Sequence, residues 1–352
     1  MSGGDPLDRA AVAAADPSGQ AAEIGDLGIH LSDALWRVES AGLRPEPAPG
    51  GLVVAGMGGS GIGGRLAAAA LGPRATAPVT LVSGYGLPPW VGGDALVLCS
   101  SYSGATEETL ACYDDATARG ARRVVATTGG ALAERARRDG VPVVPLPGGF
   151  QPRAAVGYLT VVALEAAALC GAGPSLRGEV EAASALATDL AAEWGPDGPA
   201  DGDAKAVARR LAGTVPVIAG AGPTAAVAYR WKCQLNENSK LLAFASELPE
   251  LDHNEVVGWS ASPDAERFAA VFLEDPEAHE RVRARVEVTA GLIEPSAAAV
   301  ERVRPRGNSP FERVVSLVLL GDLVSLYLAV LRGVDPGEIA AIDTLKRELA
   351  AR

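Results

Sequence analysis

Several residue types are scarce in this chain of 352 residues, and each scarcity excludes a class of protein. Its four cysteines include no CxxC pair, so we expect neither a disulfide framework nor a paired-cysteine metal site. All four lie in or beside apolar stretches, which predicts buried thiols in a reducing cytoplasm. The formal net charge is −12 and no long basic block offsets it, so we expect no binding to nucleic acid or to anionic membranes.

The sequence also lacks the features of a secreted or membrane-spanning protein. The opening residues MSGGDPLDRA have no basic start followed by an apolar run, so we expect no secretory signal peptide. Two long apolar segments carry a charged residue in their middle, Glu165 in one and Asp322 in the other, which favours buried core helices over membrane spans. We therefore expect a cytoplasmic protein.

Short apolar segments alternate with helical segments along the first half of the chain. A loosely ordered N-terminus is expected over 1–25, with a first helix near 26–42. The pattern then predicts strands at 52–56, 79–83, 95–100, 123–127 and 142–146. It predicts helices at 61–71, 105–119, 131–138 and 154–171. Such alternation is typical of βαβ units, so the expected class is α/β with mostly parallel sheets flanked by helices.

The same pattern returns in the second half. VPVIAGAGPT at 215–224 reads as a strand, a glycine turn and a helix that opens at Pro223, and it echoes LVVAGMGGSG at 52–61. Two similar α/β domains, 26–172 and 173–352, are the economical interpretation. A single duplicated sheet is the alternative.

The segment GMGGSGIGG, residues 56–64, raises the question of its ligand. It satisfies GxGxxG, but a dinucleotide site also needs an acidic residue about 20 positions on, and none occurs between residue 57 and Asp94. A P-loop needs Gly-Lys-Ser/Thr, and the first lysine of the chain is Lys205. Neither a dinucleotide nor a nucleoside triphosphate is therefore expected, and we predict no cofactor.

A second turn points to a phosphate group instead. SSYSGATEET, residues 100–109, follows an apolar strand and places hydroxyls around a helix N-terminus, where free N–H groups favour an anion. Parallel strands bring this turn and the glycine turn to one sheet edge. The alternative is ordinary helix capping. The predicted phosphate-binding residues are Gly58, Gly59, Ser60, Ser101, Ser103 and Thr106.

These two motifs resemble the sugar isomerase (SIS) superfamily, whose members bind phosphosugars. The segments QPRAAVGY, NENSK, ELPELDHNEVVGW and AIDTLKRELA narrow the resemblance to the bifunctional phosphoglucose/phosphomannose isomerase family, from about residue 26 to the end. The resemblance implies two SIS-type domains. It also implies an isomerase of carbohydrate metabolism that interconverts glucose 6-phosphate, and in the family mannose 6-phosphate, with fructose 6-phosphate through a cis-enediol, without a metal.

The resemblance also assigns four catalytic roles. Glu237 moves a proton between C2 and C1, His253 and Lys346 assist ring opening, and Arg153 stabilises the enediolate. These residue types suit the chemistry, because a carboxylate can carry the proton, a histidine titrates near neutrality and a cation supports the developing charge. In the wider family the histidine can reach the site from a neighbouring subunit, which implies a homodimer.

Each assignment has a structural alternative. Glu237 could pair with Lys240 at a polar helix end, Arg153 could face solvent at a helix N-terminus, and Lys346 could lie on a solvated helix face. The other two histidines, His30 and His279, are interpreted as surface or packing residues.

One position departs from the family pattern. A family threonine linked with acceptance of both sugar epimers aligns with Ile339, which cannot hydrogen-bond the sugar. This departure puts mannose 6-phosphate turnover in question. At the level of the whole protein, the alternative function is a non-catalytic SIS module that senses a sugar phosphate.

Overall fold

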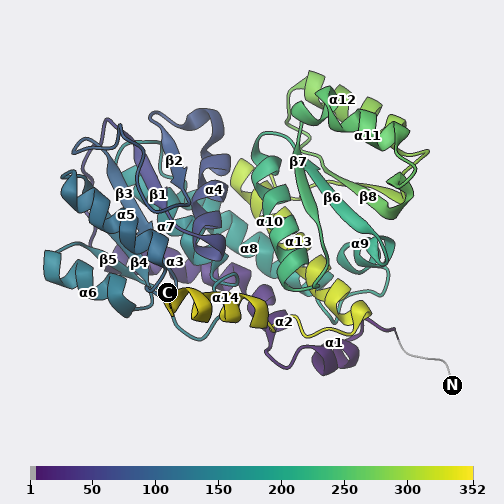
Figure 1. Cartoon of the computed structure of the whole chain (residues 1–352), viewed down its shortest axis with the longest axis horizontal. Coiled ribbons are helices and arrows are strands. Elements are labelled where there is room, and N and C mark those ends of the chain that lie inside the picture. Colours follow the sequence, from purple (N-terminus) through teal and green to yellow (C-terminus); the bar gives the residue numbers. More distant parts are fainter. Residues whose placement is uncertain (1–4, 352) are drawn as a thin grey trace. The chain divides into compact units, whose positions relative to one another are not determined.

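The computed structural model describes residues 5–351, which form two compact units (Figure 1). The first unit comprises Asp26–Asp189 and Arg306–Ser316. The second unit comprises Leu190–Pro305 together with the described parts of Met1–Gly25 and Leu317–Arg352.

The first unit contains a five-stranded parallel sheet in the order β2-β1-β3-β4-β5. Its strands are β1 (Leu52–Ala55), β2 (Val79–Val82), β3 (Leu96–Ser100), β4 (Arg122–Thr127) and β5 (Val143–Pro145). Its helices are α3 (Leu27–Ser40), α4 (Gly58–Leu71), η1 (Gly72–Arg74), α5 (Glu107–Ala118), α6 (Gly130–Asp139), α7 (Val156–Leu169) and the start of α8 (Arg177–Trp194). The strand order reverses between β1 and β3, where open parallel sheets bind ligands.

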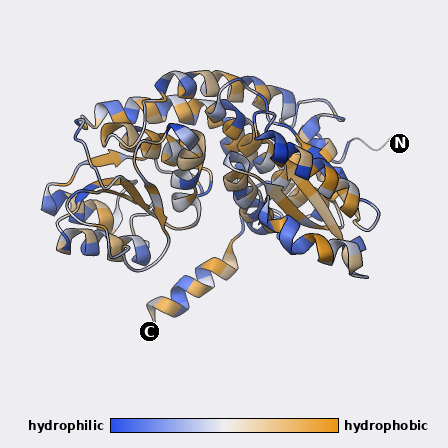
Figure 2. Ribbon diagram, turned by 90° about the horizontal axis from the view of Figure 1, so that it is seen from above, coloured by the Kyte–Doolittle hydropathy of each residue, from blue (hydrophilic) through white to orange (hydrophobic). Residues whose placement is uncertain are grey.

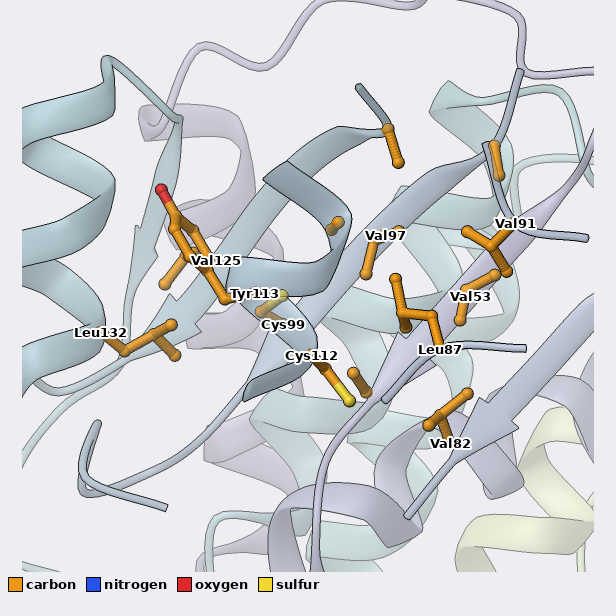
Figure 3. Packing of buried hydrophobic residues seen from close by; sticks show 14 of the residues in the cluster. Val53, Val82, Leu87, Val91, Val97, Cys99, Cys112, Tyr113, Val125 and Leu132 are labelled. Atoms are coloured by element: carbon orange, nitrogen blue, oxygen red, sulfur yellow. The ribbon is translucent and has the colours of Figure 1, made fainter. Parts of the chain in front are cut away.

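The core of the first unit fits the parallel arrangement of its sheet. Every residue of β1 and β3 is buried, as expected for strands with both faces covered by helices. Figure 3 shows the apolar cluster that these strands form with β4 and α5; its members include Val53, Val97, Cys99, Val125, Cys112 and Tyr113. The four cysteines are free; three of them are buried, as the composition predicted, and Cys233 is half-buried.

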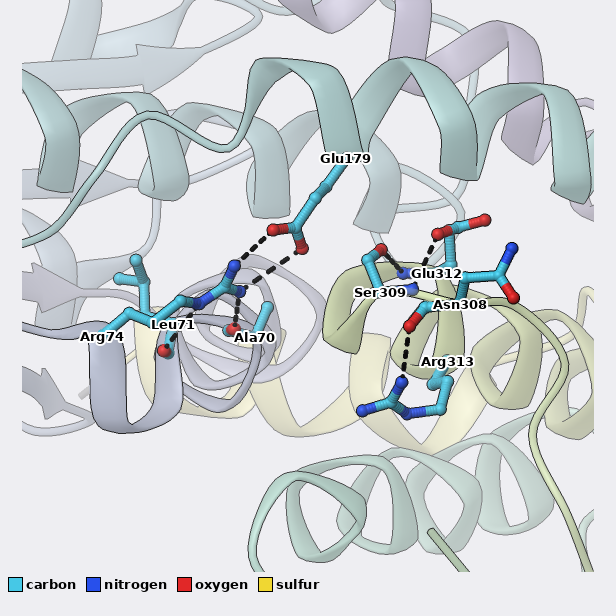
Figure 4. Close-up of polar contacts among 8 residues, drawn as sticks. All are labelled: Ala70, Leu71, Arg74, Glu179, Asn308, Ser309, Glu312 and Arg313. Atoms are coloured by element: carbon cyan, nitrogen blue, oxygen red, sulfur yellow. Dashed lines mark hydrogen bonds and ion pairs between the residues drawn. The ribbon is translucent and has the colours of Figure 1, made fainter. Parts of the chain in front are cut away.

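Polar contacts tie the remaining segments of the first unit together (Figure 4). The guanidinium of Arg74 binds the carboxylate of Glu179, which joins η1, directly after α4, to α8. At the start of α13 (Pro310–Arg332), the Ser309 amide donates to the Glu312 carboxylate at 2.8 Å, and the Glu312 amide donates to the Ser309 hydroxyl at 3.2 Å. This reciprocal capping box fixes where the helix begins.

The second unit contains a four-stranded parallel sheet in the order β7-β6-β8-β9. Its strands are β6 (Val215–Gly220), β7 (Phe244–Glu247), β8 (Phe268–Leu273) and β9 (Ala299–Val303). Its helices are α1 (Arg9–Ala15), α2 (Gln20–Gly25), α9 (Asp203–Leu211), α10 (Pro223–Glu237), η2 (Glu250–His253), α11 (Glu255–Ala261), η3 (Ala265–Arg267), α12 (Glu280–Ile293), most of α13, and α14 (Ala340–Ala350).

The last two helices differ in their surroundings. Helix α13 is long and apolar enough to cross a membrane, with a mean hydropathy of 2.4, yet 89% of that window is buried within the fold, so it is a core helix as predicted. Its Asp322 is paired with the buried Arg230 of α10. Helix α14 alternates hydrophobic and hydrophilic residues (Figure 2), and residues 340–349 are all exposed.

Two expectations about domain organisation differ from the structure. Residues 5–25 are not loosely ordered, because Leu7 and Val12 are buried and the Asp8 carboxylate caps α1 by accepting from the Ala11 amide at 2.8 Å. The first compact unit begins at Asp26, continues past 172 to Asp189 and includes Arg306–Ser316. The two separate sheets exclude a single duplicated sheet.

Candidate active site

The glycine turn of the first unit connects β1 to α4. A Cβ at Gly56 would lie 2.9 Å from the carbonyl oxygen of Ser100, so glycine is required for the turn to approach β3. Gly58 has a φ of +49°, in the left-handed region that glycine adopts without strain. The turn therefore places the first backbone N–H groups of α4 at the carboxyl edge of the sheet.

Ser60 connects this turn to the one that follows β3. Its buried hydroxyl accepts a hydrogen bond from the Tyr102 amide at 3.0 Å, and its carbonyl accepts one from the Ser100 hydroxyl at 3.1 Å. The two Ser- and Gly-rich turns thus meet at one edge of the sheet, between β1 and β3, as the sequence predicted.

The hydroxyls of the second turn do not act as ordinary caps. Thr106 occupies the N-cap position of α5, yet its side chain makes no capping bond and lies 2.8 Å from the Ser101 hydroxyl instead. Ser101 also accepts from the Gly104 amide at 3.1 Å, while the exposed Ser103 accepts from the Ala105 amide at 3.3 Å. The capping alternative is therefore wrong for the Thr106 side chain, whereas the hydrogen bond of Ser103 stays within its own turn.

Arg153 lies next to the glycine turn, three residues before α7 begins. It is 3% exposed, so the alternative of a solvent-facing arginine is wrong. A Cβ at Gly59 would lie 2.9 Å from the Arg153 backbone, so the glycine allows this segment to contact the start of α4. One turn later, Gly63 allows the same close approach to Leu159 of α7. The buried guanidinium adds a permanent positive charge near the turn.

An aromatic cluster holds the segment that leads to Arg153. The ring of His30 lies 4.9 Å from that of Phe150 and 5.1 Å from that of Tyr158. The Phe150 amide donates to the Tyr102 hydroxyl at 2.9 Å, which links the cluster to the second turn. Burial lowers the pKa of His30 below its ordinary value, in spite of Asp26 and Asp33 nearby. His30 is thus a packing residue, as predicted, whereas Tyr102 and Phe150 were not singled out from the sequence.

In the second unit, Glu237 is the last residue of α10 and is half-buried. The ammonium of Lys240 donates to the carbonyl oxygen of Glu237 at 2.7 Å. Asn238 and Ser239, which follow, are fully buried. The helix end is therefore packed, which differs from the frayed polar end that the alternative required.

His253 ends the short helix η2 and is exposed. Its imidazole makes no hydrogen bond within residues 5–351, so it can take part in an interaction with another molecule. The neighbouring Asp252 is fixed, because it accepts from Thr289 at 2.7 Å and from Arg285 at 3.0 Å. A rigid turn thus presents an accessible histidine.

Helix α14 carries the remaining predicted residues. Lys346 is exposed, and Ile339 occupies the N-cap position, where it offers no side-chain cap. The three apolar residues Ile342, Leu345 and Leu349 are exposed on the same helix. Across the part of the chain that the structure describes, no three His, Cys, Asp or Glu side chains group as a metal site.

Comparison with known proteins gives these features a context. The family model for the bacterial phospho-glucose isomerase C-terminal SIS domain matches residues 200–349. The bifunctional phosphoglucose/phosphomannose isomerase of Caldicellulosiruptor bescii is 40% identical over 303 residues, covering 85% of this chain and 89% of its own. The protein of the same name from Aquifex aeolicus is 38% identical over 300 residues, covering 85% and 90%.

Solved structures share the fold. A glucose-6-phosphate isomerase like protein from Thermus thermophilus superimposes with a TM-score of 0.64 at 21% identity, covering 97% of this chain and 98% of that one. The C-terminal domain of glucosamine-fructose-6-phosphate aminotransferase from Francisella tularensis gives 0.67 at 13% identity, covering 90% and 96%. From the sequence identities and their coverage, this chain belongs to the bifunctional phosphoglucose/phosphomannose isomerase family.

Proposed function

We propose that this protein is an aldose–ketose isomerase that interconverts glucose 6-phosphate, and more slowly mannose 6-phosphate, with fructose 6-phosphate. The observation that carries the proposal is the pair of hydroxyl-rich turns joined by Ser60 at the carboxyl edge of the first sheet. Such an edge, with two helix N-termini, favours an anion of the size of a phosphate. The phosphate contacts assigned to it are Gly58, Gly59, Ser60, Ser101, Ser103 and Thr106.

The proposed reaction has two stages. In ring opening, the anomeric hydroxyl loses its proton and the ring oxygen gains one, with His253 and Lys346 as the groups that transfer them. In isomerisation, the Glu237 carboxylate removes the proton from C2 and returns it to C1, while the proton of the C2 hydroxyl moves to the oxygen on C1. Arg153 supports the negative charge of the cis-enediolate between the two carbon proton transfers.

The preference for glucose 6-phosphate rests on Ile339. In the family pattern a threonine is expected there, and an isoleucine side chain can neither donate nor accept a hydrogen bond. A site that lacks a polar contact discriminates against the substrate that needs it. We therefore expect mannose 6-phosphate to be the poorer substrate.

A cytoplasmic homodimer is part of the proposal. Large apolar side chains are exposed on α10 and around the edge strand β7: Tyr229 is 41% exposed, Leu242 69% and Phe244 50%. Helix α10 packs against β7, so these residues belong to one region of the second unit. A second copy that covered them would remove apolar surface from water. Sedimentation at micromolar concentration tests this state, and a monomer at all concentrations contradicts it.

The first experiment measures fructose 6-phosphate formed from each aldose separately. The variant is Glu237→Gln, which keeps the shape of the side chain but removes the base. The exposed Glu294 at the end of α12 provides the matched control, Glu294→Gln. We expect activity in the wild type and the control, with a loss of about 10²-fold or more in Glu237→Gln.

Three other outcomes are distinguishable. Turnover of glucose 6-phosphate alone indicates an isomerase whose substrate range is restricted by Ile339. Equal turnover of both sugars contradicts the role given to Ile339. No turnover of either sugar, together with a rise in thermal stability on adding sugar phosphate, refutes the enzyme and indicates a non-catalytic sensor.

A further inference from the structure

The turn after Glu237 has an unusual backbone. Lys240 has a φ of +50°, the one positive φ of a non-glycine residue within residues 5–351. A side chain with a Cβ is strained in this region, so the surrounding structure must hold it there. Backbone strain of this kind occurs where a fold fixes a functional side chain in place.

Hydrogen bonds from α13 hold this turn. The side-chain amide of Asn238 donates to the Ser325 hydroxyl at 2.9 Å, and the Ser239 hydroxyl donates to the Ser325 carbonyl at 2.6 Å. All three residues are fully buried. The guanidinium of Arg332, two turns further along α13, donates to the Ser239 carbonyl at 2.9 Å. The turn is thus attached to α13 at two positions along that helix, Ser325 and Arg332.

Ser325 is the centre of this attachment. Its own hydroxyl donates to the Asp322 carbonyl at 2.7 Å, which leaves its lone pairs directed at Asn238. The Oδ1 atom of Asn238 has no hydrogen-bond partner in the described chain, so the bond to Ser325 is the contact that its buried amide depends on. Loss of that acceptor would leave the amide buried and unsatisfied.

Two further contacts fix α10 on α13 upstream of the turn. Arg230 donates to the Asp322 carboxylate through Nε at 3.0 Å and Nη2 at 2.5 Å. The Trp231 indole donates to the Leu317 carbonyl at 2.7 Å. Arg230 and Glu237 are seven residues apart and lie on one helical face, as Asp322 and Ser325 do on theirs. Helix α10 is therefore fixed in its rotation about its own axis and in its position along α13, both near Arg230 and at the turn that follows Glu237.

We infer that Ser325 is a positioning residue for Glu237, acting through Asn238 and Ser239 and assisted by Arg332. This inference rests on the proposed function, in which the Glu237 carboxylate carries the proton. A proton carrier must reach two adjacent carbons of the sugar, so a displacement of about 1 Å is enough to reduce the rate strongly. Ser325 touches neither the substrate nor the carboxylate and controls only where the helix end lies.

The test compares two buried serines of α13. Ser325→Ala removes the acceptor for Asn238, whereas Ser316→Ala removes a hydroxyl that accepts from the Arg306 amide and donates to the Arg313 carbonyl. We expect kcat for glucose 6-phosphate to fall about 10- to 100-fold in Ser325→Ala, with KM changed less than about twofold. Ser316→Ala should lower thermal stability and leave kcat at the wild-type value.

A purely structural role gives a different result. If Ser325 only stabilises the fold, kcat per folded molecule returns to the wild-type value when both variants are assayed well below their melting temperatures, and the inference is overturned. The positioning role predicts a kcat lowered by the same factor at every pH, because Ser325→Ala displaces the base and neither adds nor removes a charge. A changed pH profile also overturns the inference.

Two additional variants make the outcome interpretable. Arg332→Ala removes the hydrogen bond to the Ser239 carbonyl, and Arg332 is more exposed than Ser325. We therefore expect a folded variant with about a tenfold lower kcat, even if Ser325→Ala does not fold.

The double variant Asn238→Ala, Ser325→Ala should have the same kcat as the slower of the two single variants, because both substitutions break the same contact. If Glu237→Gln remains active, the proposed function fails. If it is inactive while Ser325→Ala and Arg332→Ala have wild-type kcat, only the positioning role fails.

Discussion

Replacing Gly63 with alanine tests whether the first unit depends on the close packing of α4 against α7. A Cβ at this position would lie 2.5 Å from the carbonyl carbon of Leu159, 2.7 Å from its Cβ and 2.8 Å from its carbonyl oxygen. Ordinary contacts begin near 3.4 Å, so the helices must separate by about 0.9 Å. Two of the three atoms are backbone, so no side-chain rotation relieves the clash. We expect a destabilisation of about 1–3 kcal/mol, the usual result of overpacking.

The assay is urea unfolding, with Gly291→Ala as the matched control. Gly291 lies inside α12 with open space where its Cβ would be, so alanine there should stabilise the protein by about 0.5–1 kcal/mol. The separation in Gly63→Ala also moves the start of α7, and Arg153 with it, away from Ser60. We therefore expect kcat/KM to fall by about tenfold or more. If Gly63→Ala is as stable and active as Gly291→Ala, the packing argument is refuted.

Three further predictions follow from buried or hydroxyl contacts. Arg230→Ala should lower the free energy of unfolding by about 3–5 kcal/mol, because it leaves Asp322 buried without its partner. The double variant Arg230→Met, Asp322→Leu should recover most of that loss, as measured by urea unfolding. The pKa of His30 is lower in the folded than in the unfolded chain, so its contribution to stability is complete above about pH 6.5 and decreases as the pH falls below that value. His30→Phe should remove this part of the pH dependence, measured by urea unfolding on either side of that pH. Thr106→Val should raise KM for sugar phosphate about tenfold without shortening α5, because the hydroxyl contacts Ser101 and does not cap the helix; an unchanged KM would contradict phosphate binding there.

Local patterns predicted the elements of this fold well because their causes are local. Helix α10 runs from Pro223 to Glu237, the bounds expected from a proline at the first helical position and the polar segment at its end. The edge at which the turn of Ser60 meets the turn of Ser100 and Tyr102 was predictable for a similar reason, since all strands of a βαβ sheet run in one direction.

Contacts between distant residues were not predictable from spacing. The burial of Arg153 depends on Gly59, which lies far earlier in the chain, and the glycine motif gave no indication that two of its members serve helix packing. Helices α1 and α2 appeared too small and polar to be ordered, but their few apolar residues are buried in the second unit. The strained Lys240 had no sequence indication at all, because lysine is not a residue that favours a positive φ.

Helix α13 also has a consequence for how the protein is made. A segment this apolar resembles a membrane span while it is still emerging from the ribosome, before its partners cover it. Its buried aspartate meets an arginine made 92 residues earlier. At about 5–20 residues per second, α10 therefore leaves the ribosome roughly 5–20 s before Asp322 does. Helix α10, which covers part of α13, is therefore synthesised before α13 itself. This order shortens the time during which chaperones or the membrane-insertion machinery can recognise the exposed α13.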